Sequence, residues 1–207
     1  MALVRPQESS SSGGFLGIQR FAIRKVQDLV YLKKTSGNPQ ICLELTLQSQ
    51  GSEYQNSVRI WGDVSFEEDG TISGETPVLK KLYAFFDSIG FPGGLNPQGQ
   101  WEVSSAEGST IVADIGTALA RYTYTGINNP KESDCPILGY VYKKWNPTKG
   151  KAYTTIYPKF YPNTPNGENS LRSFIDFMLK NGRIKEYKEG SAPAASSSPV
   201  GGESASW

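Results

Sequence analysis

The strongest constraint on the fold is a short stretch in which apolar residues recur at every second position. Large aliphatic side chains alternate there with smaller or polar ones: Ile41, Leu43, Leu45 and Leu47 against Cys42, Glu44 and Thr46. In an extended strand this period puts one set of side chains on a buried face and the other set in solvent. The stretch therefore predicts a half-buried β-strand, and with it a sheet.

Other segments predict further strands. Residues 15–34 suit one or two strands around a bulge, and Ser36-Gly37-Asn38-Pro39 is a turn by composition, so the first two segments should form an antiparallel hairpin. A third strand is expected over residues 58–61, ending at Gly62-Asp63. We expect a fourth over residues 118–124 after a short turn near Asp114, a fifth over 137–145 and a sixth over 151–160, the last two as a long hairpin.

Two helices are expected. Thr76 offers an N-cap and Pro77 the first helical position, and the apolar residues that follow recur at helical spacing until Gly90 ends the helix. Residues 90–100, with four glycines and two prolines, read as a loop. A second helix is expected over residues 170–180, ending at Asn181-Gly182.

This order of elements predicts a mainly β protein. We predict an OB-fold-like barrel, that is, a five- to six-stranded Greek-key barrel. One helix lies between its third and fourth strands, and a second helix follows at the C-terminus. Residues 1–14 and 189–207 are rich in Ser, Gly, Ala and Pro, a composition that buries too little apolar area to order a chain. We therefore expect two disordered tails around one domain, residues 15–188.

Composition argues against catalysis. The chain has no histidine, which removes the commonest general base, the commonest transition-metal ligand and every Ser-His or Cys-His pair. No phosphate-binding glycine motif or nucleophile elbow is present. We expect no enzyme, no cofactor and no metal, and we interpret Glu67, Glu68 and Asp69 as a solvated turn rather than a metal site. A weaker hypothesis is a metal-dependent enzyme on nucleic acid, which would need Glu67, Asp69 or Asp114 to converge.

The cysteines and the terminal residues bear on location. Cys42 and Cys135 could form one disulfide, but two free thiols in a reducing compartment fit better. The chain has no run of about 18 apolar residues, and residues 1–14 lack the apolar stretch of a signal peptide. We therefore expect the protein inside a cell.

Charge is segregated in one hairpin. The totals nearly balance, at 21 Lys and Arg against 20 Asp and Glu, yet residues 139–161 hold five lysines, seven aromatic residues and no acid. Tyr140, Tyr142 and Lys144 share one face of the fifth strand, and Tyr153, Thr155, Tyr157 and Lys159 share one face of the sixth. Lysines can neutralise phosphates, and aromatic rings can stack on bases, so the hairpin has both features that hold a single-stranded nucleic acid.

Two alternatives stay open for these residues. The tyrosines could be cross-strand pairs that stiffen the hairpin, with lysines that protect its edges from aggregation. A second basic group lies on the first strands, and Arg59 and Trp61 stand together on the third; these could flank the same groove or be ordinary solvated strand faces. The basic group comprises Arg20, Arg24, Lys25, Lys33 and Lys34.

Over about Gly17 to Tyr161, the chain resembles a bacteriophage family of OB-fold single-stranded-DNA-binding proteins. The resemblance lies in the order and spacing of five segments: KKTSGNPQICLELTL (33–47), VRIWGD (58–63), LKKLYAFFDSIGFP (79–92), DIGTALARYTY (114–124) and GYVYKKWNPTKGKAYTTIYPKFYP (139–162). It implies sequence-tolerant coating of single-stranded DNA during phage DNA replication or recombination, in the cytoplasm of a bacterial host cell. Unlike the acidic tails of many bacterial proteins of this kind, the chain ends GGESASW, so recruitment of replication or recombination proteins through Trp207 is a weaker hypothesis than a tail without function.

The leading hypothesis is a single-stranded-DNA-binding protein, which could form oligomers and has no membrane association. The residues expected to bind nucleic acid are Lys143, Lys144, Lys151 and Lys159 on phosphates, Trp145, Tyr140, Tyr142, Tyr153 and Tyr157 on bases, and Trp61, Arg59 and Lys33 in second rank. The rival hypothesis is a phage structural or assembly protein that uses the aromatic hairpin as a protein–protein interface, because tyrosine, tryptophan and arginine also favour such interfaces.

Overall fold

The computed structural model describes residues 16–28, 40–73 and 76–188. The predicted tails, the turn at 36–39 and Lys33 lie outside these residues. The strands are β1 Gly17–Asp28, β2 Gln40–Ser49, β3 Gln55–Asp63, β4 Gly93–Leu95, β5 Trp101–Ser105, β6 Gly108–Val112, β7 Ile137–Asn146 and β8 Lys151–Pro162. The α-helices are α1 Pro77–Ile89, α2 Ile115–Ala118 and α3 Pro165–Lys180, and single 3₁₀ turns lie at Ala120–Tyr122 and Glu132–Asp134.

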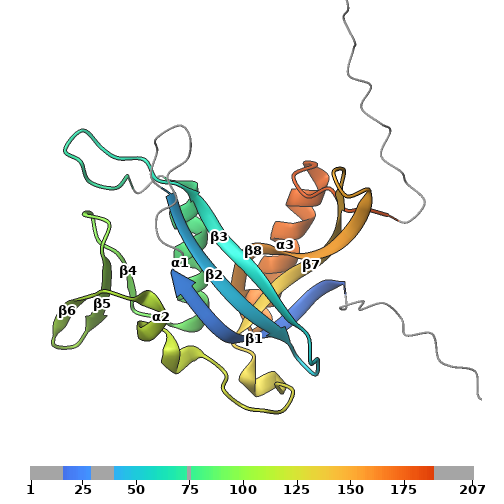
Figure 1. Ribbon diagram of the computed structural model, residues 1–207, viewed down its shortest axis with the longest axis horizontal. Coiled ribbons are helices and arrows are strands. Elements are labelled where there is room, and N and C mark those ends of the chain that lie inside the picture. Colours follow the sequence, from blue (N-terminus) through green and yellow to red (C-terminus); the bar gives the residue numbers. More distant parts are fainter. Residues whose placement is uncertain (1–15, 29–39, 74–75, 189–207) are drawn as a thin grey trace, which may run out of the picture.

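The main sheet has five strands in the order β3-β2-β1-β7-β8, with every neighbouring pair antiparallel (Figure 1). The prediction of a mainly β protein is confirmed, as are the hairpin of β1 with β2, the third strand and the long β7–β8 hairpin. The sheet curls so that its edge strands β3 and β8 contact each other. No β-ladder joins these two strands within the described residues, so the sheet is not a closed barrel.

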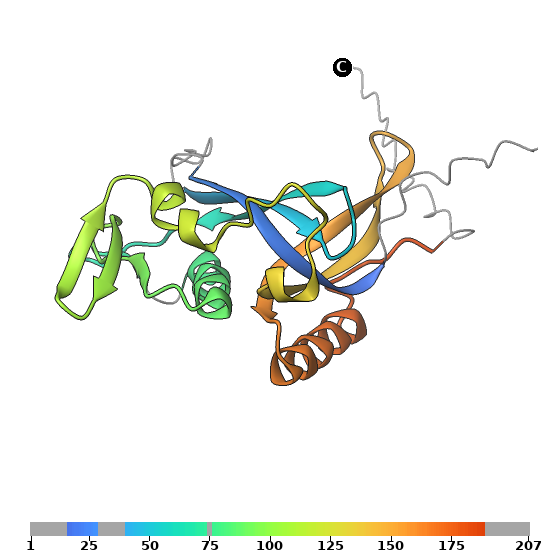
Figure 2. The same cartoon turned by 90° about the horizontal axis from the view of Figure 1, so that it is seen from below.

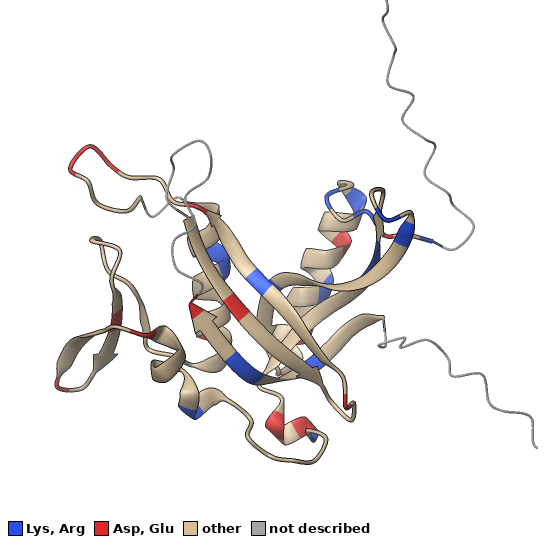
Figure 3. Ribbon diagram, in the orientation of Figure 1, with Lys and Arg blue, Asp and Glu red and all other residues tan. Residues whose placement is uncertain are grey.

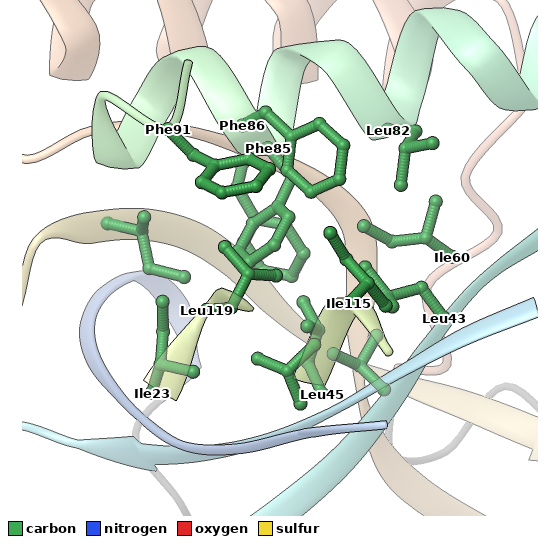
Figure 4. Close-up of a cluster of buried hydrophobic side chains, with 14 of the residues drawn as sticks. Ile23, Leu43, Leu45, Ile60, Leu82, Phe85, Phe86, Phe91, Ile115 and Leu119 are labelled. Carbon is green, nitrogen blue, oxygen red and sulfur yellow. The ribbon is translucent and has the colours of Figure 1, made fainter. Parts of the chain in front are cut away.

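Apolar side chains on the inner face of this sheet form the main core, and α1 covers them. Figure 4 shows Phe85 and Phe86 of α1 above Leu43 and Leu45 of β2 and Ile60 of β3. Contacts of α1 reach both β3 and β8, and the ring centroids of Phe85 and Phe160 lie 5.9 Å apart. The helix thus fills the seam between the two edge strands.

A close approach inside the core explains one glycine. Gly139 on β7 lies between the aromatic rings of Phe21 and Phe160, and a Cβ atom at this position would meet both rings at 3.1 Å. A larger residue here would require one or both rings to move by a few tenths of an ångström. Glycine therefore allows the rings of Phe21 and Phe160 to pack closely against β7.

A bulge in β1 redirects one arginine. The register between β1 and β2 shifts between Ile23 and Lys25, which leaves Arg24 as the extra residue. A β-bulge of this kind bends the strand and re-aims a side chain. The guanidinium of Arg24 donates to the carbonyl oxygens of Tyr124 at 2.9 Å and Gly126 at 2.6 Å, and so holds residues 124–126 against β1.

Both predicted long helices are present, with two corrections at their starts. Thr76 stands at the N-cap of α1, but its hydroxyl donates to the Ser73 carbonyl instead of capping, and Gly90 ends the helix at a φ of 66°. The second helix, α3, begins five residues earlier than predicted. There the Thr164 side chain accepts a hydrogen bond from the Gly167 amide at 3.1 Å, and Pro165 occupies the first turn.

The predicted strand at residues 118–124 is wrong. The side chain of Asp114 accepts hydrogen bonds from the amides of Gly116 and Thr117, which starts the short helix α2, and a 3₁₀ turn follows. Ile115 and Leu119, one helical turn apart, are both fully buried. The alternation of alanines and tyrosines is typical of a strand, but the Asp114 cap and the buried pair Ile115 and Leu119 determine the local structure.

A small second sheet, β4-β5-β6, was not predicted, and β4 lies inside the expected loop at 90–100. The buried indole of Trp101 lies 6.1 Å from the ring centroid of Phe86 and donates to the Asp28 carboxylate at 2.7 Å. These contacts tie the small sheet to α1 and β1. Figure 2 shows it at the far end of the molecule from the β7–β8 hairpin.

The two cysteines are free and buried, as expected. Burial, with added repulsion from Asp134, raises the pKa of Cys135 to about 11, and burial also raises the pKa of Cys42. Because a thiolate is the reactive form, both thiols should react slowly in the folded protein.

We predict that the native protein reacts very slowly with a thiol-specific disulfide reagent at pH 8. A thiol with a pKa near 11 is only about 0.1% ionised at this pH, against roughly a quarter for an ordinary cysteine. Absorbance of the released chromophore should show two thiols only after denaturant is added. Rapid release of two equivalents from the folded protein would contradict the buried positions.

A second prediction concerns the core. Phe86→Ala should lower the free energy of unfolding by about 3–5 kcal/mol, because it leaves a cavity among Phe85, Phe91 and Trp101. Phe177→Ala, in an exposed position of α3, is the matched control and should cost less than about 1 kcal/mol. Urea titrations followed by circular dichroism measure both. Equal effects would argue against the core position of Phe86.

Candidate nucleic-acid interface

The β7–β8 register puts most of the predicted aromatic and basic residues on one face of the hairpin. Tyr140 lies opposite Tyr157, Tyr142 opposite Thr155, and Lys144 opposite Tyr153. Because directly opposed residues point to the same side of a sheet, the two sets predicted for the separate strands form one surface. The outer face of the hairpin is therefore rich in tyrosine along its length.

Helix α3 covers the part of this face that is farthest from the hairpin turn. Tyr140, Tyr142 and Tyr157 are half-buried in a second apolar cluster under α3, whose buried members are Leu138, Leu171, Ile175, Met178 and Ile184. Tyr140 and Tyr142 stack on each other, with ring centroids 6.0 Å apart, and Tyr157 lies 5.6 Å from Phe174. Burial raises the pKa of Tyr142 and Tyr157. Protein contacts thus engage these three rings, through a stack within β7 and through packing under α3.

Lys159 belongs to the same covered region. Its amine lies 4.1 Å from the ring centroid of Phe174 and 5.4 Å from that of Tyr161. A cation over two aromatic rings is held by their negative faces. The lysine therefore contributes to the packing of α3 on β8.

The tip of the hairpin is exposed. Lys144, Lys149 and Lys151 are exposed, and the ring of Tyr153 keeps 42% of its surface in solvent. Lys143 and Trp145 project from the opposite, inner face of β7 and are half-buried. The tip therefore presents lysines and an open aromatic ring beyond the reach of α3.

The chain after α3 joins this tip. The Tyr187 amide donates to the Lys143 carbonyl at 2.9 Å, and the rings of Tyr187 and Trp145 stack with centroids 5.1 Å apart and planes 23° apart. The Tyr140 hydroxyl donates to the Glu186 carboxylate, and partial burial together with this bond raises the pKa of Tyr140. These contacts hold residues 184–188 beside β7.

The combined surface is strongly basic. We define the tip cluster as Lys143, Lys144, Lys149 and Lys151 of the hairpin, Lys180, Arg183, Lys185 and Lys188 of the following segment, and the rings of Trp145, Tyr153 and Tyr187. Residues 139–161 and 180–188 contain a single acid, Glu186, which is engaged by Tyr140. Figure 3 shows the basic segments gathered around the end of the hairpin and the C-terminal end of α3.

The cations and the tyrosine of residues 180–188 were not among the residues predicted to bind nucleic acid. Their signal was the run KNGRIKEYK, which places four cations and one tyrosine within nine residues. On its own this run resembles any solvated end of a helix. Only the contacts of Tyr187 and Glu186 with β7 bring it to the hairpin.

The two second-rank residues that the structure describes, Arg59 and Trp61, are elsewhere in the fold. Arg59 and Trp61 lie on the outer face of β3, where Trp61 is 54% exposed. The Arg59 guanidinium donates to Glu44 at 2.7 Å, and this carboxylate raises the pKa of Arg59. Part of the attraction of Arg59 for a phosphate is therefore cancelled by its neighbour.

Two arginines of the second basic group serve the structure. Arg24 holds residues 124–128 through their carbonyls and lies 4.5 Å from the Tyr124 ring centroid. Arg20 donates to the Asn163 side chain at 3.1 Å and pairs with Glu132 at 3.2 Å. Lys25 alone of the described members of this group is exposed and carries neither role.

The acidic candidates do not converge. The Asp69 carboxylate accepts hydrogen bonds from the amide and hydroxyl of Thr71 in an exposed turn, and these bonds lower its pKa. Asp114 caps α2. Across residues 16–28, 40–73 and 76–188, no group of three or more cysteines or carboxylates is placed to hold a metal ion. Nor does any described helix have the length and apolar composition needed to cross a membrane.

Comparison with models of protein families and with curated proteins gives no match to this chain.

Arg24 and its neighbour Lys25 make a matched pair for testing the structural role. We predict that Arg24→Ala lowers the free energy of unfolding by about 2–4 kcal/mol, because several carbonyl oxygens lose a charged donor. Lys25→Ala should leave the unfolding midpoint in urea nearly unchanged. An equally small effect of Arg24→Ala would refute its role in holding residues 124–128.

Proposed function

We propose that the protein binds single-stranded DNA without sequence specificity and without catalysis, through the tip cluster. The observation that carries the proposal is the gathering of eight cations and three aromatic rings at one end of the molecule, with one engaged acid among them. Such a surface can neutralise a phosphate backbone and offer flat faces to bases at the same time.

The exposed members of the cluster take the direct roles in this proposal. Lys144, Lys149, Lys151 and Lys185 contact phosphates, because their amines are exposed around the tip. Tyr153, with its open face, and the stacked pair of Trp145 and Tyr187 receive bases. Tyr140, Tyr142, Tyr157 and Lys159 position the hairpin under α3. This division moves stacking from the middle of the hairpin to its tip.

The arrangement of the main sheet supports an OB-fold assignment as part of the proposal. Taken in chain order, β1, β2, β3, β7 and β8 are five antiparallel strands with α1 between the third and the fourth. The first strand pairs with the second and with the fourth, as in an OB-fold. We propose an OB-fold that has no ladder between β3 and β8 and that carries residues 93–136 as an insertion between α1 and β7. The phage origin and the action in host cytoplasm rest on the resemblance alone.

Affinity for DNA tests this proposal against a protein-binding role of the same aromatic surface. Anisotropy of a labelled single-stranded oligonucleotide should show binding that weakens steeply with added salt, and duplex DNA of the same sequence should bind less well. For a single strand, the slope of log affinity against log salt should be about −0.7 for each phosphate contact. If the surface binds protein instead, the oligonucleotide should not bind even at low salt.

Variants localise the contact. The triple change Lys144→Ala, Lys149→Ala and Lys151→Ala should weaken binding and reduce the salt slope by about 2, that is about 0.7 for each lost phosphate contact. Tyr153→Ala should weaken binding by about 1–3 kcal/mol with the slope unchanged. The controls are Lys25→Ala with Lys131→Ala, and Tyr54→Ala, all exposed positions outside the tip cluster. Equal losses in the controls would place the DNA contact elsewhere.

A further inference from the structure

Strand β6 is an open edge. It pairs with β5 along Gly108–Val112, and β5 pairs with β4 on its other side, so β6 ends the small sheet. In an antiparallel edge strand, every second residue directs its N–H and C=O away from the partner strand. Within the described part of the chain, residues 109–112 make no backbone hydrogen bond outside the β5–β6 ladder. The outward groups of β6 are therefore available to another strand.

This edge lacks the features that usually prevent pairing with another chain. Its five residues, GSTIV, include no charge and no proline, and the β5–β6 register runs without a bulge. Residues 108–111 are exposed, and Ile111 keeps 56% of its surface in solvent. Edge strands of stable proteins are normally protected by lysines, prolines, bulges or covering elements. An unprotected edge is the type of surface that binds an extended peptide by adding a strand.

The surroundings of β6 are acidic. Glu102 on β5 lies opposite Ile111, Glu107 immediately precedes β6, and Asp114 follows it by two residues. Hydrogen bonds from Thr117 and Gly116 lower the pKa of Asp114 and keep it ionised. Residues 82–120 contain no lysine or arginine, and Figure 3 shows no basic segment in the small sheet. The edge strand is therefore neutral along its length, with one carboxylate before it, one after it and one on the neighbouring strand β5.

We propose that β6 is a docking site for an extended segment of a partner protein that carries lysine or arginine. Backbone hydrogen bonds to β6 supply the attachment, Ile111 contacts an apolar side chain of the segment, and the three carboxylates select its positive charge. A second copy of β6 fits less well, because antiparallel pairing about Thr110 would bring Glu107 of one copy near Asp114 of the other. The site lies at the opposite end from the tip cluster, so the partner and DNA can bind together (Figure 2).

Two capped synthetic heptapeptides test the site, one of alternating lysine and valine and one of alternating glutamate and valine. Each is titrated into the isotopically labelled full chain, and amide shifts are recorded by nuclear magnetic resonance. We expect the lysine peptide to shift the amide signals of residues 108–112. It should bind at least tenfold more tightly than the glutamate peptide, and its affinity should fall at higher salt. Ile111→Lys should weaken binding of the lysine peptide at least tenfold. The control Ile127→Lys changes a loop isoleucine that is 98% exposed and should leave this binding unchanged.

Three results would overturn the proposal: no shift at residues 108–112 with the lysine peptide, equal binding of both peptides, or shifts at β6 that depend on protein concentration without peptide. The last result would identify a second copy as the occupant. Circular dichroism confirms that both variants are folded. Oligonucleotide affinity of Ile111→Lys should equal that of the unmodified chain, so failure of this site and failure of the DNA-binding proposal are told apart.

Discussion

The fold depends on how the inner face of the five-stranded sheet is covered. The edge strands β3 and β8 approach each other without a ladder, so the seam between them needs apolar side chains from elsewhere. Phe85 and Phe86 of α1 supply them, and both are fully buried. Since exposed inner faces of β3 and β8 would leave most of the core in water, the position of α1 determines whether the sheet can remain curled.

This arrangement also decides which part of the β7–β8 hairpin stays exposed. Because α1 covers the inner face of the sheet, α3 packs on the outer face of β7 and β8. It buries the part of the hairpin that is farthest from the turn. The long strands then carry the hairpin tip past the end of α3, and residues 184–188 return to meet it. The exposed basic surface is thus a consequence of a hairpin longer than the helix that covers it.

Sequence patterns predicted the elements whose burial is one-sided. Strict alternation located β2, and helical spacing with Pro77 and Gly90 located α1. The small sheet escaped prediction because β6 is exposed on both faces and therefore has no apolar period. The tyrosines of the hairpin were correctly placed on one face, but alternation cannot tell a face covered by a distant helix from one left in solvent. For the same reason, the basic run at 180–188 could not be joined to the hairpin before the contacts of Tyr187 were known.

The separation of charge has a consequence for how the molecule meets a polyanion. Although cations and anions nearly cancel over the chain, the basic tip and the acidic small sheet lie at opposite ends of its long axis (Figures 2 and 3). A nearly neutral body of this kind has a large electric dipole moment. If the protein binds nucleic acid as proposed, the field of the strand would exert a torque on this dipole in addition to a weak net force, and the tip would turn toward the strand before contact. Diffusional encounters would then be oriented, and a larger fraction of them would be productive.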